Sequence, residues 1–358
     1  MTSVNLPVGI NLSSSGGQSS IVGQLAIDDL ISIIQENQPG NLSQQSQIAS
    51  IWLNSQMQTP VDIREIVLTG TTPPTSPVIF TSTGSNSTAL VINAQQLVSG
   101  SQIQLDNIQF ASIVGTASIM GGVGNNVVIG DDASQTIVLG PGDDVLYGGG
   151  GDDTVGSLSG NDHLYGESGN DLLFSDSGQN FFHGGKNHDI VRYAGQRDDY
   201  IVMQEHAVVK VYHREAPREA DTLLNIETIE FSDTQIALTY SDTLTFLAGT
   251  YQQILGRQAD TAGIQYWANI LEESASEADV VLTLLLSDEA ESRLPEGADD
   301  TIDWLYRGLF NRPAEEEGKR YWSELIETEG LNEVVNALAM SDEMQAYHLS
   351  HLEWSFIG

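Results

Sequence analysis

A nine-residue pattern of polar and apolar positions runs through the middle of the chain, from Gly121 to Arg192. Eight consecutive units fit without an insertion: GGVGNNVVI, GDDASQTIV, LGPGDDVLY, GGGGDDTVG, SLSGNDHLY, GESGNDLLF, SDSGQNFFH and GGKNHDIVR. The eighth place of every unit is apolar, and the sixth place is always polar. The sixth-place residues are Asn126, Gln135, Asp144, Asp153, Asp162, Asp171, Asn180 and Asp189.

Each unit predicts a glycine-rich turn followed by a short strand whose eighth-place side chain faces inward. Two units would form one coil of a parallel β-roll, so positions on the same edge recur every 18 residues. Carboxylates stacked about 5 Å apart repel each other unless a cation lies between them. Calcium, which takes roughly six to eight oxygen ligands, suits such a stack better than magnesium. The two predicted stacks are Asp153, Asp171 and Asp189 on one edge, and Asn126, Asp144, Asp162 and Asn180 on the other.

These units resemble the RTX nonapeptide repeat, G-G-x-G-x-D-x-U-x, whose copies form a parallel β-roll that binds calcium between same-side turns. The resemblance covers residues 121–192 and implies roughly four to six calcium ions. It implies the five aspartates and the two asparagines of the stacks as ligands, although the asparagines and Gln135 depart from the acidic consensus and should weaken their sites. It also implies a set of turn glycines, namely Gly140, Gly142, Gly149, Gly151, Gly160 and Gly169. A glycine-rich linker and a metal-free solenoid are the alternatives.

The register continues weakly upstream of the repeats. Phe110 and Ile119 fall in the eighth place, but Ile108 and Ala117 take the sixth place and offer no oxygen ligand. We therefore expect the β-roll to span residues 103–192, with a metal-free start near Ile103.

The segments on either side of the roll predict different elements. Apolar spacing predicts helices over 24–37 and 42–54, and strands separated by turns follow between residues 60 and 98. Residues 1–102 are thus expected to form an N-terminal α/β cap or assembly domain. Residues 193–240 alternate like strands and resemble the stretch that follows the repeats in RTX proteins. They should close the apolar end of the roll, with Tyr193, Tyr200, Ile229 and Phe231 in its core.

Residues 241–347 have helical periodicity and contain a second repeat, with an offset of 55 residues. The pattern Y-x₃-[LF]-x-R-x₅-G-x₂-YW resembles a helical module of unknown function found in secreted RTX and S-layer-like proteins, and it predicts an all-α domain. Its aromatic residues are expected to form the core between helices, with an aromatic groove for a sugar as the alternative. The two copies pair Tyr251 with Tyr306, Arg257 with Arg312, Tyr266 with Tyr321, and Trp267 with Trp322.

The charge of the chain restricts its partners. With 13 Lys and Arg against 49 Asp and Glu, the formal charge is −36, which argues against nucleic acid and anionic membrane surfaces as partners. No cysteine is present, so bound metal is the expected substitute for disulfides. No apolar run is long enough for a membrane span, and the N-terminus has no secretory signal pattern. Residues 348–358 resemble the uncleaved C-terminal signal of type I secretion.

Motifs of common enzyme classes are missing from the chain. There is no H-E-x-x-H, no G-x-S-x-G and no G-x-x-x-x-G-K-[ST], and His183 and His188 are expected to be solvated turn residues. We therefore expect a protein that is not an enzyme: an extracellular, calcium-dependent structural protein of a surface layer, matrix, filament or adhesin, exported unfolded. Its expected partners are calcium and either further copies of itself or cell-surface polysaccharide. The alternative is a secreted carbohydrate-binding or polysaccharide-modifying protein that uses the helical module for recognition.

Overall fold

The computed structural model divides the chain into two compact units. The first comprises Met1–Met203 and Lys210–Leu238, and the second comprises Gln204–Val209 and Thr239–Gly358. Within them, the structure describes residues 2–15, 19–37, 42–72, 74–205, 207–216, 218–240, 244, 247–248, 250–257, 259–273, 277–310, 313–339 and 356–357.

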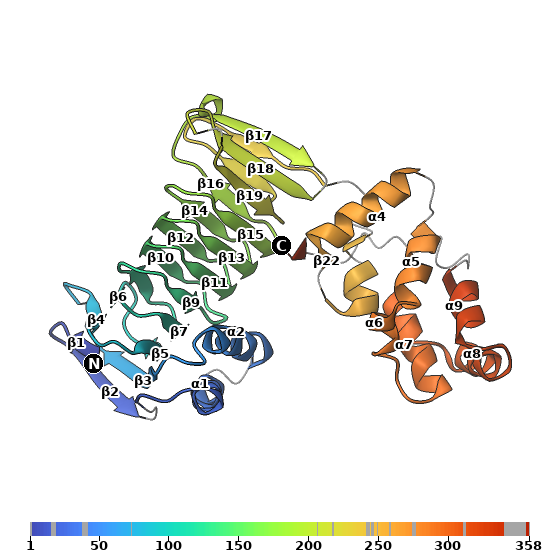
Figure 1. Ribbon diagram of the computed structural model, residues 1–358, viewed down its shortest axis with the longest axis horizontal. Helices are drawn as coiled ribbons and strands as arrows, with labels where there is room; N and C mark the ends of the chain where they lie inside the picture. The colour runs from blue at the N-terminus through green and yellow to red at the C-terminus, as the bar shows by residue number, and fades with distance from the viewer. Residues whose placement is uncertain are drawn as a thin grey trace. The chain divides into compact units, whose positions relative to one another are not determined.

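Two mainly parallel sheets run through the first unit (Figure 1). One sheet has the order β1 (Thr2–Asn5), β4 (Val78–Ser82), β6 (Gln102–Asp106), β8 (Ser118–Gly121), β10 (Thr136–Pro141), β12 (Thr154–Ser159), β14 (Leu172–Ser175), β16 (Ile190–Arg192), β20 (Thr228–Glu230) and β21 (Gln235–Ala237). The other has the order β17 (Tyr200–Glu205), β18 (Val208–His213), β19 (Ala220–Leu224), β15 (Phe181–Lys186), β13 (His163–Ser168), β11 (Val145–Gly150), β9 (Val127–Ile129), β7 (Phe110–Val114), β5 (Ser87–Gln96), β3 (Val61–Gly70) and β2 (Ile10–Ser15).

The strand register confirms that two nonapeptide units form one coil. In one sheet Val145 pairs with Val127 and with His163, and in the other Thr154 pairs with Thr136 and Leu172. Every eighth-place side chain from Val128 to Val191 is at most 1 % exposed. These side chains form the continuous interior of a parallel β-roll, because alternate residues of a strand point to opposite faces.

The roll begins earlier than residue 103, so the predicted start near Ile103 is wrong. Ile103 in β6 pairs in parallel with Val78 in β4, and Ser87 in β5 pairs in parallel with Val61 in β3. The predicted boundary between residues 102 and 103 therefore lies inside the ladders. The nine-residue pattern cannot show these first coils, because the connections between their strands differ in length while the inward apolar positions persist.

The two predicted N-terminal helices are present as α1 (Gln24–Asn37) and α2 (Leu42–Ser55). They cover the outer face of the sheet at β3, β5 and β7, rather than the end of the roll (Figure 1). Trp52 in α2 contacts Phe110 in β7 with ring centroids 4.9 Å apart, and Leu30 and Ile34 in α1 are fully buried in the same cluster. Strands β1 and β2 pair antiparallel with β4 and β3 at the first edge of each sheet.

The strands after the repeats add a further coil to the roll. Thr222 in β19 pairs in parallel with Phe181, and Thr228 in β20 pairs in parallel with Ile190. Between them and the repeats lie the short helix η1 (Arg197–Asp199) and strands β17 and β18. The predicted core positions are confirmed, since Tyr193, Tyr200, Ile229 and Phe231 are all at most 9 % exposed.

The second unit is mainly helical, but the prediction of an all-α domain is wrong. Ala259 in β22 pairs in parallel with Phe356 in β23, a contact between distant segments that helical periodicity cannot reveal. The elements are the π-helix η2 (Tyr251–Leu255), β22 (Ala259–Asp260), α4 (Thr261–Glu273), α5 (Glu277–Leu285), α6 (Asp288–Glu291), α7 (Ala298–Phe310), α8 (Glu316–Glu329), α9 (Leu331–Ala339) and β23 (Phe356–Ile357). Among the described residues, no helix combines the length and the apolar character needed to cross a membrane.

The aromatic repeat of the second unit contributes Tyr251 and Tyr306 to its core, but Tyr266 and Tyr321 are 59 % exposed, so the core prediction is wrong for these two. Trp267 and Trp322 pack against the buried cluster, and the Trp322 Nε1–H donates to the Tyr306 hydroxyl at 2.9 Å. Arg257 binds an acid, with its Nε 2.6 Å from Glu289 Oε1. Its counterpart Arg312 and most of the predicted secretion signal at 348–358 lie outside the described residues.

Candidate metal centre

The turns of the roll require glycine because the backbone is left-handed there and successive turns lie close together. Gly142, Gly151, Gly160 and Gly169, all in the fourth place, have φ between 94° and 146°, a region that side chains with a Cβ disfavour. A Cβ on Gly160 would also collide with the Gly142 carbonyl oxygen. The same kind of carbonyl contact recurs on both edges, at Gly140 against Gly122, at Gly149 against Asp131, and at Gly169 against Gly151. The predicted glycines therefore allow the turn backbone of one coil to approach a carbonyl oxygen of the preceding coil.

The predicted sixth-place residues meet in two hydrogen-bonded ladders. In each step, a side-chain oxygen accepts from the backbone N–H of the residue one coil earlier. On one edge the donors Gln135, Asp153 and Asp171 lie 2.7, 2.8 and 2.8 Å from Asp153, Asp171 and Asp189. On the other edge Asn126, Asp144 and Asp162 donate to Asp144, Asp162 and Asn180 at 2.7, 3.0 and 3.1 Å.

Both ladders extend beyond the repeats to acids that sequence reasoning missed. Asp189 N–H donates to Glu227 Oε2 at 2.7 Å, and Asn180 N–H donates to Asp221 Oδ1 at 2.8 Å. A signal for them exists, because Asp221-Thr-Leu and Glu227-Thr-Ile repeat the acid-x-apolar order of the sixth to eighth places. The inserted strands β17 and β18 shift these residues out of the nine-residue register.

A second pair of ladders uses the exposed fifth place, which sequence reasoning also missed. These side chains accept from the N–H of the residue one coil later. Asp143 accepts from Asn161 and Asp152 accepts from Asn170, both at 2.8 Å. The fifth place is Asn125, Ser134, Asp143, Asp152, Asn161, Asn170, Gln179 and His188 in the eight units, so its polar character could have indicated this role.

The buried carboxylates are electrostatically unfavourable as they stand. The second oxygens, Oδ2, of Asp153, Asp171 and Asp189 are buried and have no hydrogen-bond partner. Burial, together with the neighbouring carboxylate of Asp171, raises the pKa of Asp153 to about 8 and that of Asp189 to about 9. Burial likewise raises the pKa of Asp171 and of Glu227 to about 7. Buried oxygens of this kind cost free energy unless a partner neutralises them.

The comparison with protein families decides what these turns are. Residues 120–155, 129–164 and 157–191 match the model described as RTX calcium-binding nonapeptide repeat (4 copies). This part of the chain consists of RTX calcium-binding repeats. Residues 230–294 and 282–348 match two copies of a domain of unknown function, DUF4214, in agreement with the predicted two-copy module. No curated protein matches the chain.

The residues of the RTX roll fit calcium. Calcium binds carboxylate and carbonyl oxygens with flexible geometry, and the turns supply both kinds of oxygen while their N–H donors are engaged in the ladders. Among the described residues, no three histidine or acidic side chains form a cluster that could hold a metal ion by themselves. Backbone carbonyls from the turn glycines would therefore complete the coordination around the ladder aspartates, as the RTX resemblance implies.

The neutral sixth-place residues of the RTX roll turn their amide groups toward oxygens. Asn126 Nδ2 donates to the Ile108 carbonyl at 2.6 Å, and Gln135 Nε2 donates to the Gly115 carbonyl at 2.7 Å. The Asn180 side chain also hydrogen-bonds Asp221. An N–H donor directed at these oxygens competes with a cation, which gives a physical basis for weaker sites at these positions.

Of the two histidines of the RTX roll that were predicted to be solvated, His188 is exposed and His183 is not. His183 is buried, and its Nε2 lies 3.0 Å from the Asn225 amide nitrogen, so the prediction of a solvated turn residue is wrong for it. Desolvation lowers the pKa of His183 to about 4. His188 Nε2 lies 3.1 Å from the Thr228 hydroxyl. Both histidines therefore connect the repeats to the coil that follows.

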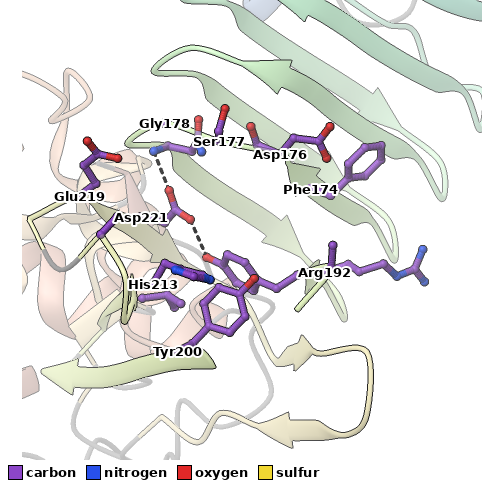
Figure 2. Close-up of a pocket in the computed structure, with 15 residues that line it drawn as sticks. Phe174, Asp176, Ser177, Gly178, Arg192, Tyr200, His213, Glu219 and Asp221 are labelled. Carbon is purple, nitrogen blue, oxygen red and sulfur yellow. Dashed lines mark hydrogen bonds between the residues drawn. The ribbon is translucent and has the colours of Figure 1, made fainter. Parts of the chain in front are cut away.

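A cavity of about 380 Å³ lies where the last repeats meet the following strands. Figure 2 shows Phe174, Tyr200 and His213 on its wall, with the Asp221 carboxylate and its hydrogen bonds beside the turn at Gly178. Asp221 Oδ2 accepts from the Tyr193 hydroxyl at 2.9 Å. The end of this ladder is thus closed by a tyrosine donor.

Proposed function

We propose that the chain is a calcium-dependent extracellular structural protein, without catalytic activity, that serves in a surface layer, matrix, filament or adhesin. RTX repeats indicate calcium binding, and proteins that carry them are typically secreted. Type I secretion in the unfolded state followed by folding outside the cell fits a chain whose repeat region depends on the ion.

The buried, unpartnered Oδ2 atoms of Asp153, Asp171 and Asp189 carry this proposal. Where calcium is scarce, these oxygens and the conformational entropy of the glycine turns oppose folding of the roll. Extracellular calcium-binding modules have dissociation constants of about 10⁻⁴–10⁻³ M, so calcium at about millimolar concentration would fill such sites and stabilise the coil.

The remaining charge supports assembly of several copies. Six ions would supply only about twelve positive charges against the formal charge of −36. Further calcium on the acidic surface could bridge neighbouring copies. The alternative, a sugar groove built on Trp267 and Trp322, has less support because both indoles pack against the helical core.

Circular dichroism and light scattering during a calcium titration test the proposal, with magnesium as the control cation. Calcium from chelator to about 10 mM should produce β signal that magnesium does not, followed by growth in particle mass. A gain of β signal in a particle that stays monomeric would contradict the assembly role. No calcium-specific change at all would contradict calcium-dependent folding itself.

A further inference from the structure

We infer that calcium binds mainly along one edge of the roll, and that this edge holds one more site beyond the repeats, closed by Glu227. The inference rests on the proposed calcium binding and specifies where it occurs.

The two edges are named here after residues that occupy the first place of their units. The glycine edge has Gly130, Gly148, Gly166 and Gly184 there, and its ladder is Gln135, Asp153, Asp171, Asp189 and Glu227. The serine edge includes Ser157 and Ser175, and its ladder is Asn126, Asp144, Asp162, Asn180 and Asp221.

The turns of the two edges have different backbones. On the glycine edge, the second-place residues Gly149, Glu167 and Gly185 have φ of 109°, 85° and 117°. On the serine edge, none of the second-place residues has a positive φ, and neither does Asp131 in the first unit of the glycine edge; the serine-edge residues are Gly122, Gly140, Leu158 and Asp176. Glu167 adopts a region that residues with a side chain disfavour, so the glycine-edge conformation is imposed by the roll and does not depend on glycine alone.

On the glycine edge, oxygen atoms lie around the space that a side chain in the first place would fill. A Cβ on Gly148 would lie 2.7 Å from Asp153 Oδ2 and 2.8 Å from the Gly166 carbonyl oxygen. The same pair recurs one coil later, where Gly166 faces Asp171 Oδ2 and the Gly184 carbonyl. A carboxylate oxygen and a carbonyl oxygen thus meet in each step, and the absence of a side chain keeps the space between them open.

Hydroxyl groups take the corresponding position on the serine edge. Ser157 Oγ lies 3.5 Å from Asp144 Oδ2 and Ser175 Oγ lies 3.3 Å from Asp162 Oδ2, while the Tyr193 hydroxyl donates to Asp221. Calcium on this edge would replace hydrogen bonds that already exist. On the glycine edge it would neutralise buried oxygens that have no partner, so its net gain is larger there.

The glycine-edge pattern continues past the last repeat. Gly184 faces Asp189 Oδ2 and the Asn225 carbonyl oxygen, the same pair as in the earlier steps. Asn225 has a φ of 49°, and two residues later Glu227 accepts the Asp189 N–H. Asp189 is fully buried and its Oδ2 has no partner. Calcium at this step would tie the coil of β19 and β20 to the repeats, which end at residue 191 in the family match.

A matched pair of variants of the full chain tests the last site. Glu227→Gln and Asp221→Asn each replace the acid at the end of one ladder with an amide that can still accept the backbone N–H. Calcium bound per chain, measured by equilibrium dialysis, should fall by about one ion in Glu227→Gln and stay unchanged in Asp221→Asn. Unchanged binding in Glu227→Gln, or an equal loss in both variants, would overturn the inference.

A second pair keeps the test decisive if Glu227→Gln also loosens the coil after the repeats. Asp171→Asn on the glycine edge should raise the calcium concentration for half-maximal β signal by about tenfold or more, and Asp162→Asn on the serine edge by less than about threefold. Equal shifts would reject the edge preference while leaving calcium-dependent folding intact. An unmodified chain that binds no calcium would instead refute the proposed function.

Discussion

Coils on the two sides of Gly121 pair their strands in the same kind of parallel ladder, but their turns contain different residues. Upstream, Ala117 occupies the sixth place and is 4 % exposed. On the other edge Phe110 pairs with Val127, so the half-buried Gln109 falls in the sixth place, and the sequence prediction of Ile108 there is wrong. Downstream, Asp144 and Asp153 occupy that place and are buried. The upstream sheet is also covered by α1 and α2, whose side chains pack against β3, β5 and β7.

This difference between the two sets of coils means that the strands and the turns contribute to stability in different ways. The apolar interior is continuous through both sets of coils and contributes about 25 cal/mol per Å² of buried apolar surface wherever it occurs. Buried carboxylates subtract from this contribution only in the downstream coils. The upstream coils are therefore expected to fold without metal and to offer the downstream coils a strand edge on which calcium-dependent folding can proceed.

Removal of calcium should give the largest contrast between the two regions. At about 100 times the dissociation constant, each bound ion stabilises the folded state by about 2.7 kcal/mol, so its loss should accelerate amide exchange about 100-fold per site in the coils that depend on it. Hydrogen exchange with and without chelator should therefore show loss of protection from β11 to β16 and retained protection in β3, β5 and β7. Uniform loss across both regions would refute the separation.

The pH dependence should have opposite signs with and without calcium. The pKa values of Asp153 (about 8) and Asp189 (about 9) are raised in the folded chain. As pH rises from about 4 to 9, these two carboxyl groups therefore lose their protons at lower pH in the unfolded chain than in the folded chain. The calcium-free roll therefore has its full stability below about pH 4 and loses stability as pH rises through these values. With calcium, ionised carboxylates are required for binding, so stability should rise with pH.

Thermal midpoints by circular dichroism at about pH 5, 7 and 9, in calcium-free buffer and in about 10 mM calcium, measure this effect. Because the whole chain is acidic, the control is the double variant Asp153→Asn and Asp189→Asn, in which the calcium-free slope should become shallower. A calcium-free midpoint that rises from pH 5 to pH 9 would contradict the sign.

The sequence was sufficient to predict the repeats because their register is strict. Glycine in the turn, a polar sixth place and an apolar eighth place recur without an insertion, so the stacks of Asp153, Asp171 and Asp189 and of Asp144 and Asp162 could be predicted and do form ladders. The helices over 24–37 and 42–54 were predicted from apolar spacing alone and differ from α1 and α2 by one residue at most.

The remainder depends on contacts between distant segments, which local patterns do not encode. Glu227 and Asp221 lie outside the register because β17 and β18 intervene, and the pairing of Val61 with Ser87 spans a connection of irregular length. The serine and glycine edges could not be told apart either. The first-place residues differ visibly, but only the positions of the Ser157 and Ser175 hydroxyls show that the difference reaches the carboxylates.

Gln135→Glu should make the first step of the glycine edge depend on calcium, as the coils downstream of it are expected to. Gln135 Nε2 now donates to the Gly115 carbonyl and, at 2.8 Å, to Asp131 Oδ1. A carboxylate in its place would lose both hydrogen bonds and repel Asp131, whose pKa burial already raises. The free energy of unfolding in chelator should fall by about 1–3 kcal/mol.

In calcium the same variant should recover most of this loss, because the Gly130 position already faces the Gly148 carbonyl and the Gln135 side-chain oxygen, the pair that marks the other steps of the glycine edge. Urea unfolding with and without calcium measures both values. Gln179→Glu, the same chemical change at an exposed fifth place, is the control and should shift neither by more than about 0.5 kcal/mol. An equal loss in chelator and in calcium would mean that the acid alone does not make a coil calcium-dependent, and that the turn backbone carries the difference between the two regions.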